Sequence, residues 1–274
     1  MAPVYAGYSN RMAQKPVPNA LILELEPVCE ANMDRHLGTD DIWFAHDYVP
    51  FDRGENFAFL GGRDWDSSSM TLPRPYTDAC EILLLLKDNL AAHHRELVDH
   101  FILEDWWGRW LGRWTAEEHL HAIALREYLV VTREVDPTAN EEARVDYVTK
   151  GYRSEQYSQL EVLAYMAFTE RTHAVFCRNL AAKLEEPLLA GLVDRIARDE
   201  ARHEEFFSNL VACFLNFTSD RNKDISTSLR QSQTRHSVQL LIPSRARVKS
   251  SYIRCKGEDS RRLSAEPPKY STMS

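Results

Sequence analysis

The chain has 274 residues, 44% of them hydrophobic, and a formal net charge of −8 at pH 7. This length is enough for one large domain with a sizeable core. Twelve basic and five acidic residues give residues 218–274 a net charge of +7, which leaves −15 for the rest of the chain. A body so acidic argues against a nucleic-acid-binding protein.

Residues 1–16 read as a disordered leader. They lack the apolar segment of a secretory signal. The longest apolar run, ILLLL at 82–86, is far shorter than the roughly 18 residues that span a bilayer. The five cysteines are odd in number and share no metal or redox spacing, so reduced thiols are expected. These features predict a cytoplasmic protein with no membrane insertion.

Residues 17–217 form the predicted domain. The sequence predicts a helix over 19–36, then an irregular stretch over 37–75 that is punctuated by Gly and Pro. Four long patterns follow in which apolar residues recur every three or four positions, and they cover 76–101, 104–133, 154–183 and 188–216. Such spacing places each set on one helix face. Four of these helices predict an all-α, antiparallel four-helix bundle with extra helices.

The tail at 218–274 differs from this domain. It has 12 serines, two aromatic residues and no sustained apolar period, so we expect it not to fold by itself. Two explanations stay open: a genuine basic arm, or the product of a shifted reading frame.

Charged residues interrupt the apolar stripes. Glu118 and His121 are in register with apolar residues of the second pattern, Glu170 with those of the third, and Glu200 and His203 with those of the fourth. An unpaired buried carboxylate costs several kcal/mol. Three of them with two histidines therefore call for positive charge between them, which two divalent metals would supply.

The spacing of these residues suits a metal site. Glu-x-x-His on a helix places both side chains on one face, about one turn apart. Two such motifs, together with one Glu from each of two further helices, make the carboxylate di-iron site of ferritin-like bundles. Carboxylate and imidazole ligands suit iron or manganese.

The motifs resemble those of a known family. GRWTAEEHLHA (112–122) and RDEARHEE (198–205) look like the two metal motifs of the soluble acyl-acyl-carrier-protein (acyl-ACP) desaturases, the plant stearoyl type and its actinobacterial relatives. FTERTH (168–173) resembles the segment that supplies their third-helix Glu, and HLGTDDIWFAHDYVP (36–50) their N-terminal region. The likeness covers about 17–217 and implies a ferritin-like fold.

The resemblance also implies residue roles. Glu118 and Glu200 would bridge two irons, His121 would bind one, and Glu170 with His203 the other. Trp43 and Asp199 would extend from His121 as a route for electrons. The implied reaction introduces a cis double bond into a saturated acyl chain on acyl carrier protein, using O₂ and electrons from a ferredoxin. A homodimer is expected on the same ground.

One position departs from the family pattern. Lys87 stands in the inward stripe where the family has its first-helix ligand Glu, and a charged ammonium cannot bind a metal. In one outcome Lys87 pairs with Glu118 or Glu200 and replaces the charge of one iron, which leaves one metal or none. In the other, Lys87 bends away and water or Asp88 completes the site.

A second departure concerns the third motif. The family has a Thr three residues after the third-helix Glu, whereas this chain has His173 there and Thr172 one place off. We expect His93, His94 and His173 to be satisfied by hydrogen bonds rather than to bind metal. The tryptophans at 106, 107, 110 and 114 are expected to pack in the core.

The leading prediction is therefore a di-iron acyl-ACP desaturase. The alternative is a catalytically impaired homologue that binds acyl carrier protein or acyl chains without desaturating them, which Lys87 favours. Two further alternatives are an oxidase with a radical on Tyr165 or Tyr128, and a plain structural bundle.

Overall fold

The computed structural model describes residues 20–39, 42–151 and 157–217. All of them belong to the first of two compact units, residues 1–236. The predicted leader at 1–16 and the predicted tail at 218–274 lie outside the described residues.

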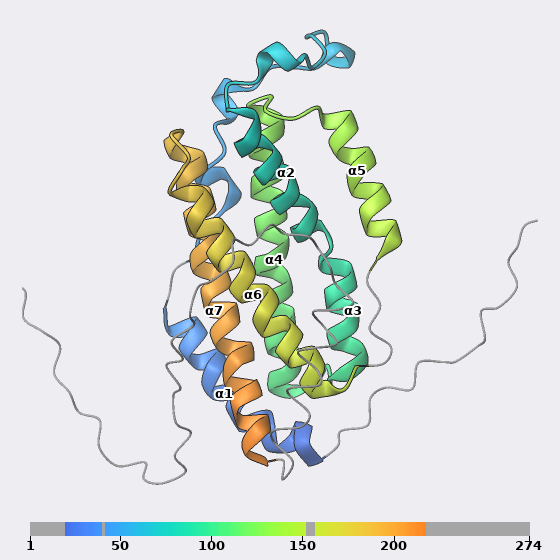
Figure 1. Ribbon diagram of the computed structural model, residues 1–274, viewed down its shortest axis with the longest axis vertical. Coiled ribbons are helices and arrows are strands. Elements are labelled where there is room, and N and C mark those ends of the chain that lie inside the picture. The colour runs from blue at the N-terminus through green and yellow to red at the C-terminus, as the bar shows by residue number, and fades with distance from the viewer. Residues whose placement is uncertain (1–19, 40–41, 152–156, 218–274) are drawn as a thin grey trace, which may run out of the picture. The chain divides into compact units, whose positions relative to one another are not determined.

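A four-helix bundle forms the core of this unit (Figure 1). Helix α4 (Asp105–Val131) packs against α7 (Pro187–Phe217). It also packs against α2 (Arg74–Asp88) and α3 (Leu90–His100), which follow one another along the same side of the bundle. The bundle closes through α6 (Gln159–Ala181), which packs along α7 and also contacts α3. Helix α1 (Ala20–Gly38) lies against α4 and α7. No strand occurs in the described ranges, so the predicted all-α, ferritin-like class is confirmed.

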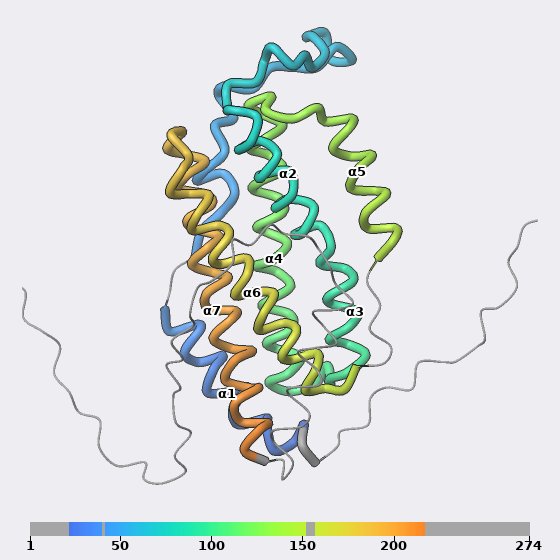
Figure 2. The backbone as a smooth tube through the Cα atoms, viewed as in Figure 1, coloured from blue at the N-terminus to red at the C-terminus, as the bar shows by residue number. Residues whose placement is uncertain are grey.

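The prediction of one helix over 76–101 is wrong at one point. The structure ends α2 at Asp88 and starts α3 at Leu90. Asn89 between them has φ −74° and ψ 4°, and its N–H is shared between the carbonyls of Leu86 and Lys87. Asn is a weaker helix former than Leu or Lys, and the apolar stripe continues across the break. In Figure 2 the backbone passes from α2 into α3 beside α4.

A further helix, α5 (Pro137–Lys150), lies between the second and third predicted helices, where the sequence predicted no element. Its ends carry clear local signals. Asp136 accepts hydrogen bonds from the N–H groups of Thr138 and Ala139, and Pro137 opens the helix. Only Asn140 of α5 is buried, so the helix has no apolar stripe by which it could have been recognised.

The predicted irregular stretch over 37–75 is irregular over its described residues 42–73, while its ends belong to α1 and α2. It contains four short 3₁₀ helices: η1 (Ala45–Asp47), η2 (Phe51–Arg53), η3 (Ala58–Leu60) and η4 (Ser67–Ser69). Two residues just after α4 hold it. The buried Arg133 donates to the backbone carbonyls of Asn56 and Arg63, and Glu134 accepts from the N–H of Thr71. The end of α4 thus fixes the path by which the chain reaches α2.

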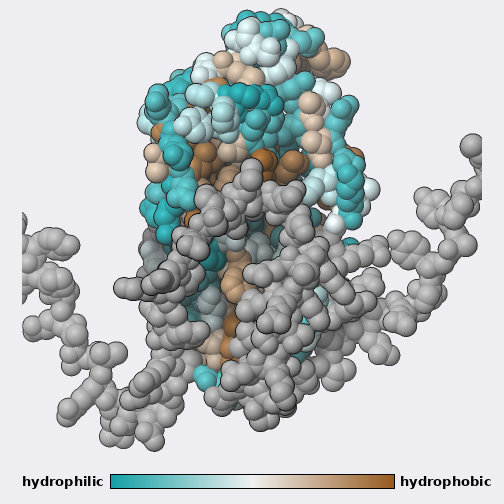
Figure 3. Space-filling view, viewed as in Figure 1, coloured by the Kyte–Doolittle hydropathy of each residue, from teal (hydrophilic) through white to brown (hydrophobic). Residues whose placement is uncertain are grey.

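In the part of the surface that is coloured in Figure 3, polar residues predominate, and a group of hydrophobic residues lies near the middle of the picture. Within the described ranges, no helix combines the length and the apolar character that crossing a bilayer requires. The four described cysteines, Cys29, Cys80, Cys177 and Cys213, are free and buried.

Candidate metal centre

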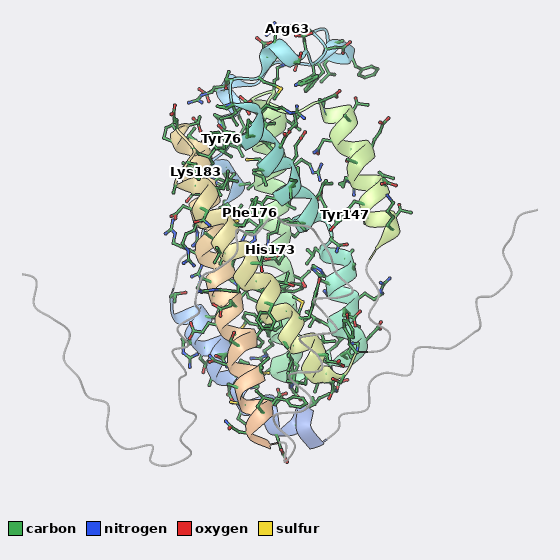
Figure 4. All side chains as sticks on the ribbon, viewed as in Figure 1. Arg63, Tyr76, Tyr147, His173, Phe176 and Lys183 are labelled. Atoms are coloured by element: carbon green, nitrogen blue, oxygen red, sulfur yellow. The ribbon has the colours of Figure 1, made fainter. Side chains whose placement is uncertain are left out.

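Three long helices bring five charged or imidazole side chains into the middle of the bundle. Glu118 and His121 come from α4, Glu170 from α6, and Glu200 and His203 from α7. Each is at most 5% exposed. We refer to these five residues as the central cluster. His173, whose Nδ1 atom lies 3.5 Å from Glu200 Oε2, is labelled at mid-height of the bundle in Figure 4.

One set of donor atoms in this cluster is compact enough for a metal. A ligand atom from each of Glu118, Glu170, Glu200 and His203 lies within 4.8 Å of the other three. The Nδ1 atom of His203 is 3.3 Å from Glu118 Oε1. His121 is not in that set, although its Nδ1 atom lies 2.9 Å from Glu200 Oε1 and 3.3 Å from Glu118 Oε1.

Lys87 lies inside the central cluster and pairs with Glu118 and Glu200, as in the first of the two predicted outcomes. Its Nζ atom is 2.9 Å from Glu118 Oε2, 2.6 Å from Glu200 Oε1 and 3.1 Å from His173 Nδ1. An ammonium has three N–H donors and no acceptor, so all three donors have partners and His173 Nδ1 must accept. Asp88 points elsewhere and pairs with Arg126 at 2.5 Å.

The electrostatics keep Lys87 charged. Burial opposes the charge, but the carboxylates of Glu118, Glu200 and Glu170 outweigh it and hold the pKa of Lys87 above its ordinary value. The pKa of Glu200 lies well below its usual range, because Lys87 and His121 outweigh burial. Burial and the ammonium of Lys87 lower the pKa of His173, which keeps its imidazole neutral and able to accept.

Glu170 behaves differently from the other two carboxyls. Burial, reinforced by the charges of Glu118 and Glu200, raises the pKa of Glu170 well above its usual range. Its Oε1 accepts from Trp114 Nε1 at 3.0 Å, while its Oε2 has no hydrogen-bond partner. A buried oxygen without a hydrogen-bond partner is costly, so Glu170 Oε2 is a candidate ligand atom for a cation.

The charges decide how many metals the centre fits. Two divalent ions and the Lys87 ammonium would place five positive charges beside the three carboxylates of Glu118, Glu170 and Glu200, in a site that water does not screen. One divalent ion with Lys87 places three positive charges beside three negative ones. Uncompensated buried charge is strongly destabilising. The residues present therefore fit one divalent metal and do not fit two.

A second layer of acids holds the histidines. His121 Nε2 lies 3.2 Å from Asp199 Oδ2, which also accepts from Trp43 Nε1 at 2.9 Å. Arg195 pairs with the other Asp199 oxygen at 3.0 Å. The structure thus brings Trp43 and Asp199 into contact with His121, and their role as an electron route stays a prediction.

Glu117 is the counterpart of Asp199 on the other motif, and the sequence analysis missed it. His203 Nε2 lies 2.8 Å from Glu117 Oε2, and Glu117 also contacts His36 Nε2 and Arg113 Nε. A signal was present in the sequence. In both RWTAEEHLH (113–121) and RIARDEARH (195–203), an acid directly precedes the Glu-x-x-His motif, and an Arg stands four residues before that acid. In each motif this acid contacts the histidine of the other helix.

The centre therefore has two halves around the shared Glu118 and Glu200. The His121 half consists of His121, Asp199, Trp43, Lys87 and His173. The His203 half consists of His203, Glu117, His36 and Glu170.

Other residues singled out in the sequence lie outside the centre or support it. The hydroxyl of Thr172 donates to the Phe168 carbonyl of its own helix, at an exposed position. His94 Nδ1 lies 2.9 Å from the hydroxyl of Thr115, and the His93 ring lies against Tyr165. Tyr128 donates to Glu186. Trp107, Trp110 and Trp114 are buried in the core, while Trp106 is partly buried against it.

Comparisons with known proteins agree with this geometry. A family described as "Fatty acid desaturase" matches residues 19–233. DesA2 of Mycobacterium tuberculosis H37Rv, provisionally named an acyl-ACP desaturase, is 79% identical over 209 residues, 76% of each chain. DesA1 of the same strain, likewise provisionally named, is 37% identical over 207 residues, 73% of this chain and 61% of DesA1.

A solved structure extends the likeness to three dimensions. The X-ray structure of DesA2 from Mycobacterium tuberculosis H37Rv aligns with a TM-score of 0.68 and 63% sequence identity, and the alignment covers 82% of both chains. The resemblance noted in the sequence is thereby confirmed. The chain belongs to the fatty acid desaturase family that contains the acyl-ACP desaturases.

Proposed function

We propose that this protein binds acyl chains carried on acyl carrier protein at a centre with one divalent metal, and that it does not perform the di-iron desaturation typical of its family. The single observation that carries this proposal is the contact of Lys87 Nζ with Glu118 at 2.9 Å and with Glu200 at 2.6 Å. These are the two carboxylates that would have to bridge a pair of irons.

The residues on the His203 half would hold the metal: Glu170 and His203 together with an oxygen of Glu118 and of Glu200. Iron or manganese suits such a donor set. A bound ion would supply positive charge and an open coordination position. The protein itself contributes a buried, dry site, since every ligand side chain is nearly inaccessible to solvent.

Acyl carrier protein as partner follows from the relatives, two of which are provisionally named for this substrate. A plant relative, stearoyl-ACP 9-desaturase 4 of Arabidopsis thaliana, is 28% identical over 140 residues, 49% of this chain and 34% of the plant protein. We extend the substrate class to this chain. A ferredoxin and O₂ belong to the desaturase alternative only, and a homodimer is proposed by the same resemblance.

The second candidate is an active di-iron desaturase. Two features favour it. The other predicted ligands are present, and the outer acids Asp199 and Glu117 contact the histidines His121 and His203. In that case Lys87 would have to leave Glu118 and Glu200 when the second iron enters.

Product analysis separates the two candidates. Purified protein is incubated with stearoyl-loaded carrier protein, reduced ferredoxin and O₂, and the acyl chain is examined by mass spectrometry. We expect no unsaturated product above the detection limit from the natural chain. After Lys87→Glu, which restores a carboxylate, we expect product at least about 100-fold above that limit. Lys87→Gln, which removes the charge without adding a ligand, is the matched control. Efficient desaturation by the natural chain would contradict the proposal.

A further inference from the structure

His36 lies at the end of α1, outside the two metal motifs, and contacts the outer acid of the His203 half. Its Nε2 atom lies 2.9 Å and 3.0 Å from the two oxygens of Glu117. The side chain is 4% exposed. The ring of Trp110 meets it edge-on at a centroid distance of 5.2 Å, and the ring of His203 is stacked nearly parallel at 5.9 Å. His36 is therefore held tightly in place.

Glu117 determines which nitrogen of His203 is free. Its Oε2 accepts from His203 Nε2, so the other nitrogen, Nδ1, is the one that faces Glu118. A histidine ligand binds a metal through a nitrogen lone pair, and the group bonded to its second nitrogen fixes the tautomer and the ring orientation. Glu117 can do this only while its own carboxylate stays in one place.

Two residues fix Glu117 from outside. Arg113 lies one helical turn away on α4, with Nε 2.5 Å from Glu117 Oε1. His36 approaches from α1, a different helix, and contacts both oxygens. The side chain of Arg113 is one-third exposed, whereas His36 is buried. His36 is thus the partner that ties Glu117 to the rest of the fold.

The His121 half has an equivalent arrangement with a different consequence. Trp43 donates to Asp199, as His36 contacts Glu117, and Asp199 contacts His121. On that half the Lys87 ammonium donates hydrogen bonds to Glu118 and Glu200, the two carboxylates that His121 also contacts. His121 also lies outside the compact donor set, so loss of the Trp43 hydrogen bond should weaken metal binding less than loss of the His36 contact does.

We infer that His36 is a positioning residue for the metal: through Glu117 it holds His203 so that Nδ1 points into the carboxylate set. This inference rests on the one-metal centre proposed above. It predicts a functional asymmetry between two residues that make matching contacts, His36 and Trp43.

Calorimetric titration of Mn²⁺ into the metal-free full-length protein tests the inference. His36→Phe keeps a ring against Trp110 but loses the hydrogen bond, and we expect its Kd to rise about tenfold or more. His36→Gln keeps an N–H donor for Glu117, and we expect its Kd to return to within about threefold of the natural value. Trp43→Phe also keeps a ring and loses one hydrogen bond, so it is the matched comparison, and its Kd should rise less than that of His36→Phe. Urea unfolding of each metal-free variant checks that it folds.

Each other outcome overturns a defined part of the account. An unchanged Kd for His36→Phe, or an equal loss in Trp43→Phe, refutes the role of His36 and leaves the one-metal centre standing. A loss of one equivalent of Mn²⁺ in His36→Phe, rather than of affinity, would mean that His36, Glu117 and His203 themselves hold an ion. No binding of Mn²⁺ by the natural chain refutes the one-metal centre and the inference together.

Discussion

The two halves of the centre share one local sequence pattern, but we propose that only the His203 half binds a metal. In both, an Arg, an outer acid and a Glu-x-x-His follow at the same spacing, and each outer acid contacts the histidine of the opposite helix. The difference comes from α2, whose Lys87 contacts the two shared carboxylates, Glu118 and Glu200, and His173. A single side chain from a third helix can thus turn a symmetric pair of metal positions into one ammonium and one metal position.

The largest expected effect comes from removing the ammonium. Lys87→Met leaves Glu118 and Glu200 buried without their cation, and breaking a buried ion pair in this way costs about 3–5 kcal/mol. Urea unfolding of the metal-free protein measures the loss. Lys183→Met, at an exposed position of the loop between α6 and α7, is the control and should have little effect. An equal stability of Lys87→Met and the natural protein would mean that Lys87 is not the counter-charge.

Glu170→Gln sharpens the comparison from the His203 half. Burial and neighbouring carboxylates already favour the protonated, neutral form of Glu170, which Gln imitates, so the stability of the metal-free protein should change by less than about 1 kcal/mol. Metal binding needs the carboxylate, and we expect Mn²⁺ affinity to fall by about 100-fold, or about 2.7 kcal/mol. Calorimetry measures the affinity. Unchanged binding would exclude Glu170 from the donor set.

His173→Leu gives the smallest effect and probes the His121 half. The substitution leaves one Lys87 N–H without its acceptor, so we expect a loss of about 1–2 kcal/mol in metal-free stability. Mn²⁺ affinity should change by less than about threefold, because His173 contacts the ammonium and does not belong to the donor set. A large loss of affinity with unchanged stability would instead make His173 a ligand.

Sequence reasoning predicted the four core helices because their buried faces repeat every three to four residues. The same register placed Glu118, Glu170 and Glu200 inward, and the structure has all three buried. Helix α5 was not predicted, because only Asn140 of it is buried and its sequence therefore lacks an apolar repeat. The break at Asn89 was not predicted, because the apolar stripe continues from α2 into α3 across this single residue.

Glu117 and His36 could not be found by register. Glu117 lies one position before Glu118, so its side chain points about 100° away from the inward face and reaches His203 from outside the cluster. His36 lies 81 residues from Glu117 in sequence, and only the packing of α1 against α4 and α7 brings the two together. The spacing of Arg113, Glu117 and the Glu-x-x-His motif marks Glu117 in the sequence, but its contact with His36 depends on tertiary structure, which spacing along one chain does not encode.

The count of metal ions per chain tests the central claim most directly. Protein with Lys87 in place is loaded with excess ferrous iron without oxygen, freed of unbound metal and analysed by mass spectrometry for iron and protein. We predict one iron per chain for the natural sequence. Two irons per chain, bound while Lys87 is present, would contradict the account.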